Sequence, residues 1–216
     1  MSDNLIWSYL IHLGDNMWGD YGPEYGAAET NFGKILKENF QGYRDEMIIS
    51  SKAGHSMWAG PYGDGSSRKN LMASIDQSLR RTGLEYFDIF YSHRYDPNTP
   101  IEETMQALVD IVRAGKALYA GISNYPADKQ QECYDYLRAA HVPCVIGQYK
   151  ASILCPETLQ ENLPVARDNG SGFICFSPLA QGLLTNRYLN GIPAGSRASK
   201  NVFLRPEHVT DEAIGM

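Results

Sequence analysis

Short apolar runs alternate with longer amphipathic stretches from residue 47 onward, and this alternation constrains the fold more than any other feature. Five runs rich in Ile, Val, Phe and Tyr have the length of buried parallel strands. Strands that alternate with helices are the signature of repeated βαβ units, so we expect an α/β fold with a parallel sheet. The predicted strands cover residues 47–50, 87–91, 117–122, 142–147 and 172–176.

The stretches between these runs carry helix signals. Residues 67–82 repeat Leu or Ile every fourth position on one face, and Gly83 follows as a stop. We expect Thr99 to cap the next helix, because Glu102 stands three residues later and completes a capping box. Two further helices are predicted over residues 125–140 and 156–168.

Repeated βαβ units fit either a barrel or a doubly wound sheet. A doubly wound dinucleotide-binding fold usually places G-x-G-x-x-G after its first strand. The nearest match, residues 63–65, does not follow a predicted strand and does not complete the motif. We therefore favour a (β/α)₈ TIM barrel, formed by one domain over residues 1–216.

Charge and cysteine content exclude several classes of function. A net charge of −6 over 216 residues makes nucleic acid and anionic membranes poor partners. No apolar run approaches the roughly 20 residues needed to span a bilayer, and the acidic N-terminus is unlike a signal peptide. The four cysteines form no C-x-x-C pair, so no metal or redox site is indicated. We expect a cytoplasmic protein.

Polar residues close the predicted strands, where barrel enzymes carry their chemistry. Lys52, His93, Asn124 and Gln148 each lie at or just after a predicted strand. Taken singly, such residues are usually surface or structural. Together with Tyr21 they suit carbonyl reduction, because a tyrosine beside a lysine ammonium has a lowered pKa and can donate a proton.

Several motifs occur in order over most of the chain: DYGP (20–23), ETNFG (29–33), ISSKAG (49–54), DIFYSHR (88–94), GKALY (115–119), GISNY (121–125) and FSPLAQGLLT (176–185). Together they resemble the aldo-keto reductase superfamily. Residues 57–63, 67–69 and 188–193 are most similar to the subgroup of bacterial L-glyceraldehyde 3-phosphate reductases and potassium-channel β subunits.

The resemblance implies NADPH as cofactor and a small carbonyl compound as substrate. It implies Tyr21 as proton donor, Lys52 as its partner and His93 as the residue that orients the carbonyl. The implied contacts to the cofactor are Ser123, Asn124 and Gln148 on the nicotinamide amide, Phe176 as stacking ring, and Ser177, Pro178, Leu179, Gly182 and Leu183 along the pyrophosphate.

Three departures from the family pattern leave alternatives open. Asn16 stands where the family has a catalytic aspartate, with Asp15 beside it. Residues 1–19 diverge from the family pattern. We expect the regions of the first and last barrel strands to be missing, and the segment that binds the adenosine 2′-phosphate to be missing as well. Three alternatives therefore stay open: an NADPH-dependent reductase, a non-catalytic cofactor-binding or regulatory protein, and an inactive fragment. The oligomeric state, including a homo-oligomer, also stays open.

Overall fold

The computed structural model describes residues 11–12, 26–201 and 204–215. Its parallel strands form one sheet whose spatial order follows the chain from β1 to β6. The strands are β1 (Ile11–His12), β2 (Ile48–Ala53), β3 (Phe87–Ser92), β4 (Ala117–Ser123), β5 (Cys144–Lys150) and β6 (Gly172–Phe176). The α-helices are α1 (Ala27–Asn39), α2 (Arg68–Thr82), α3 (Ile101–Arg113), α4 (Ala127–Ala139), α5 (Glu157–Asp168), α6 (Arg197–Lys200) and α7 (Asp211–Ile214), and the 3₁₀ turns are η1 (Arg44–Glu46), η2 (Ala180–Gly182), η3 (Asn186–Tyr188) and η4 (Pro206–His208).

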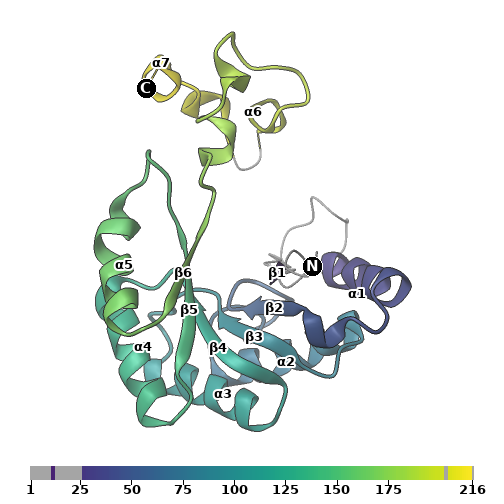
Figure 1. The fold of residues 1–216 in the computed structure, drawn as a ribbon. Coiled ribbons are helices and arrows are strands. Elements are labelled where there is room, and N and C mark those ends of the chain that lie inside the picture. The colour runs from purple at the N-terminus through teal and green to yellow at the C-terminus, as the bar shows by residue number, and fades with distance from the viewer. Residues whose placement is uncertain (1–10, 13–25, 202–203, 216) are drawn as a thin grey trace, which may run out of the picture.

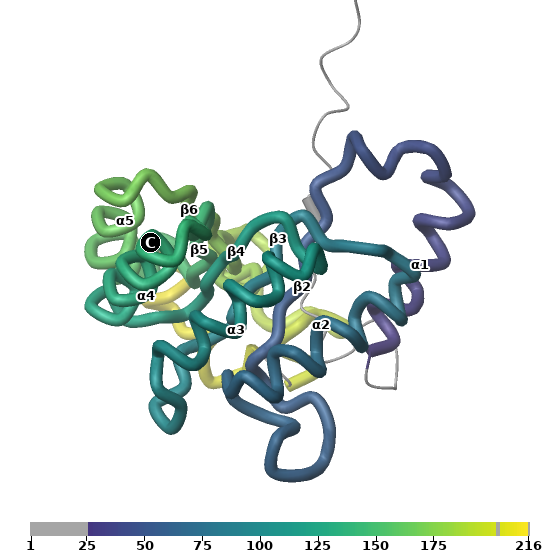
Figure 2. Tube along the Cα trace, turned by 90° about the horizontal axis from the view of Figure 1, so that it is seen from below, coloured from purple at the N-terminus to yellow at the C-terminus, as the bar shows by residue number. Residues whose placement is uncertain are grey.

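Helices α1 to α5 follow one another around the outer face of the curved sheet (Figures 1 and 2). Each contacts the next, because a parallel sheet needs a crossover between successive strands and here helices supply it. The main core lies between the two layers, where Phe90 and Ile122 of the sheet pack with Ile75 and Leu108 of the helices. This half-barrel confirms the expected α/β architecture of the TIM-barrel type.

The predicted helices between residues 67 and 168 are confirmed, and two strands end three residues later than predicted. β2 continues through Lys52 to Ala53, and β5 continues through Gln148 to Lys150. The strands predicted from apolar residues ended too early, because the polar residues Lys52 and Gln148 are part of the strands. The expected cap was wrong, since the Thr99 hydroxyl donates to the Asp96 carboxylate at 2.8 Å.

Helix α1 was not predicted, because the face that it buries is not apolar. Glu29 and Gly33 are buried there beside Leu36. The Ser51 hydroxyl donates to Glu29 Oε1 at 2.9 Å, and Arg81 of α2 pairs with Glu29 Oε2 at 3.1 Å. A Cβ at Gly33 would lie 2.6 Å from the Thr82 carbonyl oxygen, so glycine permits the close approach of α1 to α2.

The chain after β6 leaves the sheet and forms a small cluster of its own (Figure 1). Tyr188, Ala198 and Leu204 are its buried residues, and Val209 and Ile214 pack against them. Helix α7 begins at Asp211, and the Thr210 hydroxyl caps it by accepting from the Ala213 backbone N–H. Across the described helices, none is long and apolar enough to cross a membrane.

We predict that Glu29→Gln lowers the free energy of unfolding by about 1–3 kcal/mol, because it removes the negative charge that pairs with the largely buried Arg81 guanidinium. Urea denaturation followed by circular dichroism would measure this. Glu38→Gln is the control, since it removes an exposed carboxylate from the same helix. Equal effects of the two substitutions would contradict the structural role of Glu29.

Candidate active site

Residues of β2, β3 and β4 that the sequence analysis singled out share one face of the sheet. Lys52 is in register with Tyr91, and Tyr91 is in register with Gly121. Residues in register on neighbouring strands point the same way, as do residues two apart on one strand. His93, two after Tyr91, and Ser123, two after Gly121, therefore follow the face of Lys52 at the carboxyl ends of the strands.

The same face continues across β5 and β6. Ser123 is in register with Gln148, and Gln148 with Ile174, two residues before Phe176. Ser51 points to the opposite side, where it meets Glu29 of α1. The face that carries Lys52, Ser123, Gln148 and Phe176 is thus the inner face of the half-barrel, away from the helices.

Lys52 and Gln148 meet across the inside of the sheet. The Lys52 ammonium donates to Gln148 Oε1 at 2.6 Å, and both side chains are buried. In a flat sheet β2 and β5 would lie roughly 14 Å apart, three strand spacings. The bond therefore depends on the curvature of the half-barrel, and it supplies a polar partner to a buried ammonium.

A group of hydroxyl and amide side chains surrounds this bond at the ends of β4 and β5. The Ser123 hydroxyl donates to the Gln148 carbonyl oxygen at 2.8 Å. The Asn124 amide donates to Ser123 Oγ at 3.0 Å and to the His93 carbonyl oxygen at 3.2 Å. Asn124 adopts a left-handed backbone with φ 55°, which asparagine tolerates better than most residues. The amide is thereby fixed next to His93.

His93 is buried and packs against a second histidine. Its backbone N–H donates to the Ala53 carbonyl oxygen at 2.8 Å, which continues the pairing of β2 with β3. The His55 ring stands edge to face with the His93 ring, with centroids 4.3 Å apart and planes at 88°. Sequence reasoning missed His55; its only signal was its position three residues after Lys52.

Tyr91 forms part of the inner face and was also missed. It is fully buried, and a Cβ on Gly121 would lie 2.6 Å from its ring, so only glycine admits this packing. Burial raises the pKa of the Tyr91 hydroxyl, with a smaller effect from Cys144 in the same direction. Tyr91 therefore stays protonated near neutral pH and is poorly suited to proton transfer.

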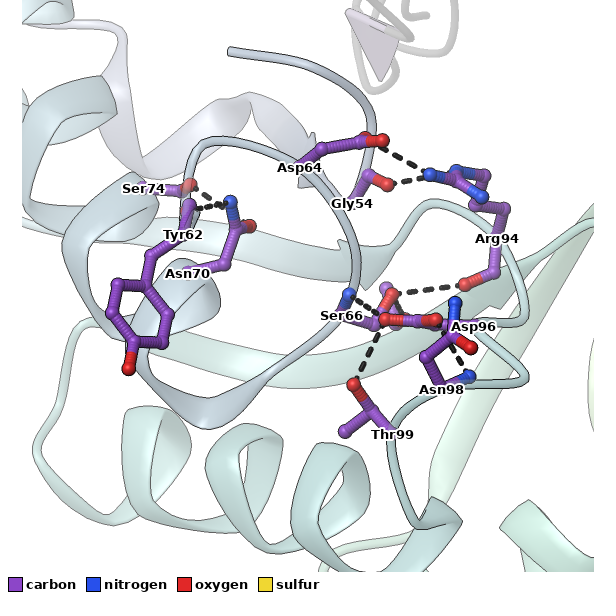
Figure 3. Close-up of polar contacts among 11 residues, drawn as sticks. Gly54, Tyr62, Asp64, Ser66, Asn70, Ser74, Arg94, Asp96, Asn98 and Thr99 are labelled. Carbon is purple, nitrogen blue, oxygen red and sulfur yellow. Dashed lines mark hydrogen bonds and ion pairs between the residues drawn. The ribbon is translucent and has the colours of Figure 1, made fainter. Parts of the chain in front are cut away.

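The loop between β2 and α2 is fastened to the loop after β3 (Figure 3). The Asp96 carboxylate accepts hydrogen bonds from Ser66 N, Asn98 N and the Thr99 hydroxyl at 2.8–2.9 Å. Although burial alone would raise the pKa of Asp96, these hydrogen bonds and the charge of Arg94 lower it overall. This carboxylate holds the two loops that border Lys52 and His93.

The segment proposed for the pyrophosphate follows β6. Phe176 is half-buried at the end of that strand. Ser177, Ala180 and Gln181 have positive φ angles of 55°, 46° and 63°, so the backbone turns sharply several times within a few residues. The turns are closed by internal hydrogen bonds, in which the backbone N–H groups of Ala180, Gly182 and Leu183 donate to the carbonyl oxygens of Ser177, Leu179 and Ala180. Pro178, Leu179, Gly182 and Leu183 lie in the same turn.

Two residues assigned catalytic roles from the sequence, Tyr21 and Asn16, lie outside the described residues, as does Asp15. The structure thus brings together Lys52, His93 and the cofactor set of β4 and β5, and the roles of all these residues stay predictions. No group of three or more His, Cys, Asp or Glu side chains in the described ranges is arranged to hold a metal ion.

Comparison with known proteins adds family evidence to this geometry. The aldo/keto reductase family model matches residues 6–212. The L-glyceraldehyde 3-phosphate reductase of Escherichia coli K12 is 55% identical over 179 residues, which are 82% of this chain and 52% of that protein. The reductase of the same name from E. coli O157:H7 matches to the same extent. The chain therefore spans about half the length of these relatives.

We predict that Asp96→Asn lowers the free energy of unfolding by about 1–3 kcal/mol at neutral pH, because charge-assisted hydrogen bonds are lost. The folded-state pKa of Asp96 lies below its ordinary value of 3.8. Its contribution is therefore present above about pH 4 and is lost as the pH falls through the folded-state pKa.

Urea denaturation between pH 7 and pH 3 would measure both effects. The wild type should lose more stability than Asp96→Asn over the acid part of this range. Asp45→Asn, at an exposed position of η1, is the control. Parallel pH profiles for wild type and Asp96→Asn would refute the role of the Asp96 carboxylate.

Proposed function

The chain belongs to the aldo/keto reductase family of NAD(P)-dependent oxidoreductases, and we propose that it reduces the carbonyl group of small aldehydes and ketones with NADPH. The observation that carries this proposal is the buried Lys52 ammonium, on the inner face that also carries His93 and is bordered by the amides of Gln148 and Asn124. Phosphorylated three-carbon aldehydes are the first substrates to test, because both relatives are named for one.

The side chains at the ends of β4 and β5 fit a nicotinamide group. A carboxamide needs both hydrogen-bond donors and acceptors, and Ser123, Asn124 and Gln148 provide hydroxyl and amide groups within one cluster. Phe176 would stack on the ring, and the turn from Ser177 to Leu183 would lie along the pyrophosphate. When bound, NADPH supplies a hydride for the carbonyl carbon.

The protein itself would supply the proton and the polarising groups. Hydride addition leaves negative charge on the carbonyl oxygen, and we assign the proton donor for this oxygen to Tyr21. The Lys52 ammonium would lower the pKa of that tyrosine. His93 would donate a hydrogen bond to the same oxygen and orient the carbonyl. The packing of His55 against His93 supports this role, because it restricts the orientation of the His93 ring.

A second candidate function is a non-catalytic cofactor-binding or regulatory protein, favoured by Asn16. An asparagine keeps a hydrogen bond to a lysine but removes the negative charge that the family places there. If this reading holds, the chain binds NADPH without turnover, and Asn16→Asp restores reduction.

We predict saturable binding of NADPH to the purified chain, measured by the change in its fluorescence. Phe176→Leu should weaken the affinity roughly twofold to tenfold, because a stacked aromatic pair is lost. Tyr119→Leu is the matched control, since Tyr119 is a half-exposed aromatic residue near the opposite end of β4. No binding by a chain shown to unfold cooperatively would count against the proposal.

We also predict that Tyr21→Phe lowers aldehyde turnover roughly 10²- to 10⁴-fold while NADPH binding is retained, because only the proton donor is removed. Steady-state oxidation of NADPH with glyceraldehyde would measure this. Tyr43→Phe is the control, as Tyr43 is 59% exposed before η1. Unchanged turnover in Tyr21→Phe would exclude Tyr21 as the donor.

A further inference from the structure

Arg94 follows His93 in the chain, and its side chain reaches the loop that follows β2 (Figure 3). Its Nε donates to the Gly54 carbonyl oxygen at 2.9 Å, and its Nη2 pairs with Asp64 Oδ1 at 2.9 Å. These are its side-chain partners within the described part of the chain. Because Gly54 lies two residues after Lys52, the guanidinium is held at the border of the candidate active site.

The pair of Arg94 with Asp64 is weakly held. The Asp64 side chain is 56% exposed and the Arg94 side chain 31% exposed, so water and salt screen the attraction. A guanidinium has five N–H donors, and its planar fork matches a phosphate better than a single carboxylate oxygen. An incoming dianion can therefore take the place of Asp64 while Gly54 still accepts from Nε.

The other arginine near this loop is bound elsewhere. Arg68, at the start of α2, pairs with Asp110 of α3, and its backbone N–H donates to Glu103. These partners place its side chain among the helices and not at the ends of the strands. The Asp96 carboxylate, which also borders Arg94, is already occupied by three hydrogen bonds.

We propose that Arg94 is the residue that selects a phosphorylated aldehyde, and that Asp64 holds its guanidinium until the substrate phosphate displaces it. Arg94 follows His93 in the chain and binds Gly54, two residues after Lys52, so its guanidinium lies beside the residues that we assigned to the carbonyl group. The inference rests on the proposed reductase function only for the identity of the substrate. The anion site itself is the Arg94 guanidinium, which the Gly54 carbonyl oxygen holds in place and the Asp64 carboxylate occupies until an anion binds.

Phosphate binding provides a test that does not depend on turnover. Inorganic phosphate would be titrated into the intact chain at constant ionic strength, with binding followed by NMR. We expect Arg94→Gln to weaken binding roughly tenfold to a hundredfold, because charged hydrogen bonds are lost. Asp64→Asn should tighten binding, because it removes the competing carboxylate. Arg68→Gln is the control with the same change in charge.

The sign of the Asp64→Asn effect separates recognition from a structural role. If the ion pair only fastened the loop, Asp64→Asn would weaken phosphate binding as Arg94→Gln does, and the proposal would be overturned. Equal phosphate affinity in wild type and Arg94→Gln would also overturn it. Thermal melting of each variant would show whether a loss reflects unfolding, and the gain expected for Asp64→Asn cannot arise from unfolding.

The preference between two aldehydes links the site to the reaction. The ratio of kcat/KM for glyceraldehyde 3-phosphate to that for glyceraldehyde should fall roughly tenfold or more in Arg94→Gln, mainly through KM, and stay unchanged in Arg68→Gln. An unchanged ratio in Arg94→Gln contradicts the inference. If neither aldehyde is reduced while phosphate binds as expected, the proposed reductase function fails and the anion site stands.

Discussion

The hydrogen bond between the Lys52 ammonium and Gln148 Oε1 connects the geometry of the sheet to its chemistry. An ammonium that is withdrawn from water needs polar partners. Gln148 is such a partner for Lys52, and it lies on β5, three strands away. The contact requires a curved sheet, and helices α1 to α5 pack in sequence around the outer face of that curve. The inner face can then be polar, because the apolar core lies between the sheet and the helices.

Strand polarity then decides where reactive groups gather. Side chains at the carboxyl ends of β2 to β5 meet on this inner face, and the loops that follow are fastened around them. Asp96 joins two of these loops through charge-assisted hydrogen bonds, and Asn124 turns back onto His93. Arg94, held by Gly54 and Asp64, adds a cation at the border. The residues that we propose for a cofactor amide, a carbonyl group and an anion thus lie at neighbouring strand ends.

The sequence was informative where local rules act and silent where contacts are distant. In helix α2, for example, Leu or Ile at every fourth position and the glycine stop at Gly83 predicted the element correctly. Helix α1 escaped because its buried residue Glu29 is satisfied by Ser51 and Arg81, far along the chain. Pro100, and not Thr99, is the N-cap of α3, and the Thr99 hydroxyl donates to the carboxylate of Asp96 three residues earlier in the preceding turn. For His55 the sequence offered only its position three residues after Lys52, which does not indicate the contact with His93. The roles of Tyr21 and Asn16 stay predictions.

Transfer of deuterium from NADPH deuterated at nicotinamide C4 to glyceraldehyde tests the central claim most directly, with the product alcohol analysed by mass spectrometry. The account predicts deuterium on the former carbonyl carbon with the wild-type chain and a loss of at least roughly 10²-fold in rate with Lys52→Met. Lys37→Met, at an exposed position of α1, is the matched control. Absence of label in the product of a folded, NADPH-bound chain, or equal rates for wild type and Lys52→Met, would contradict the account.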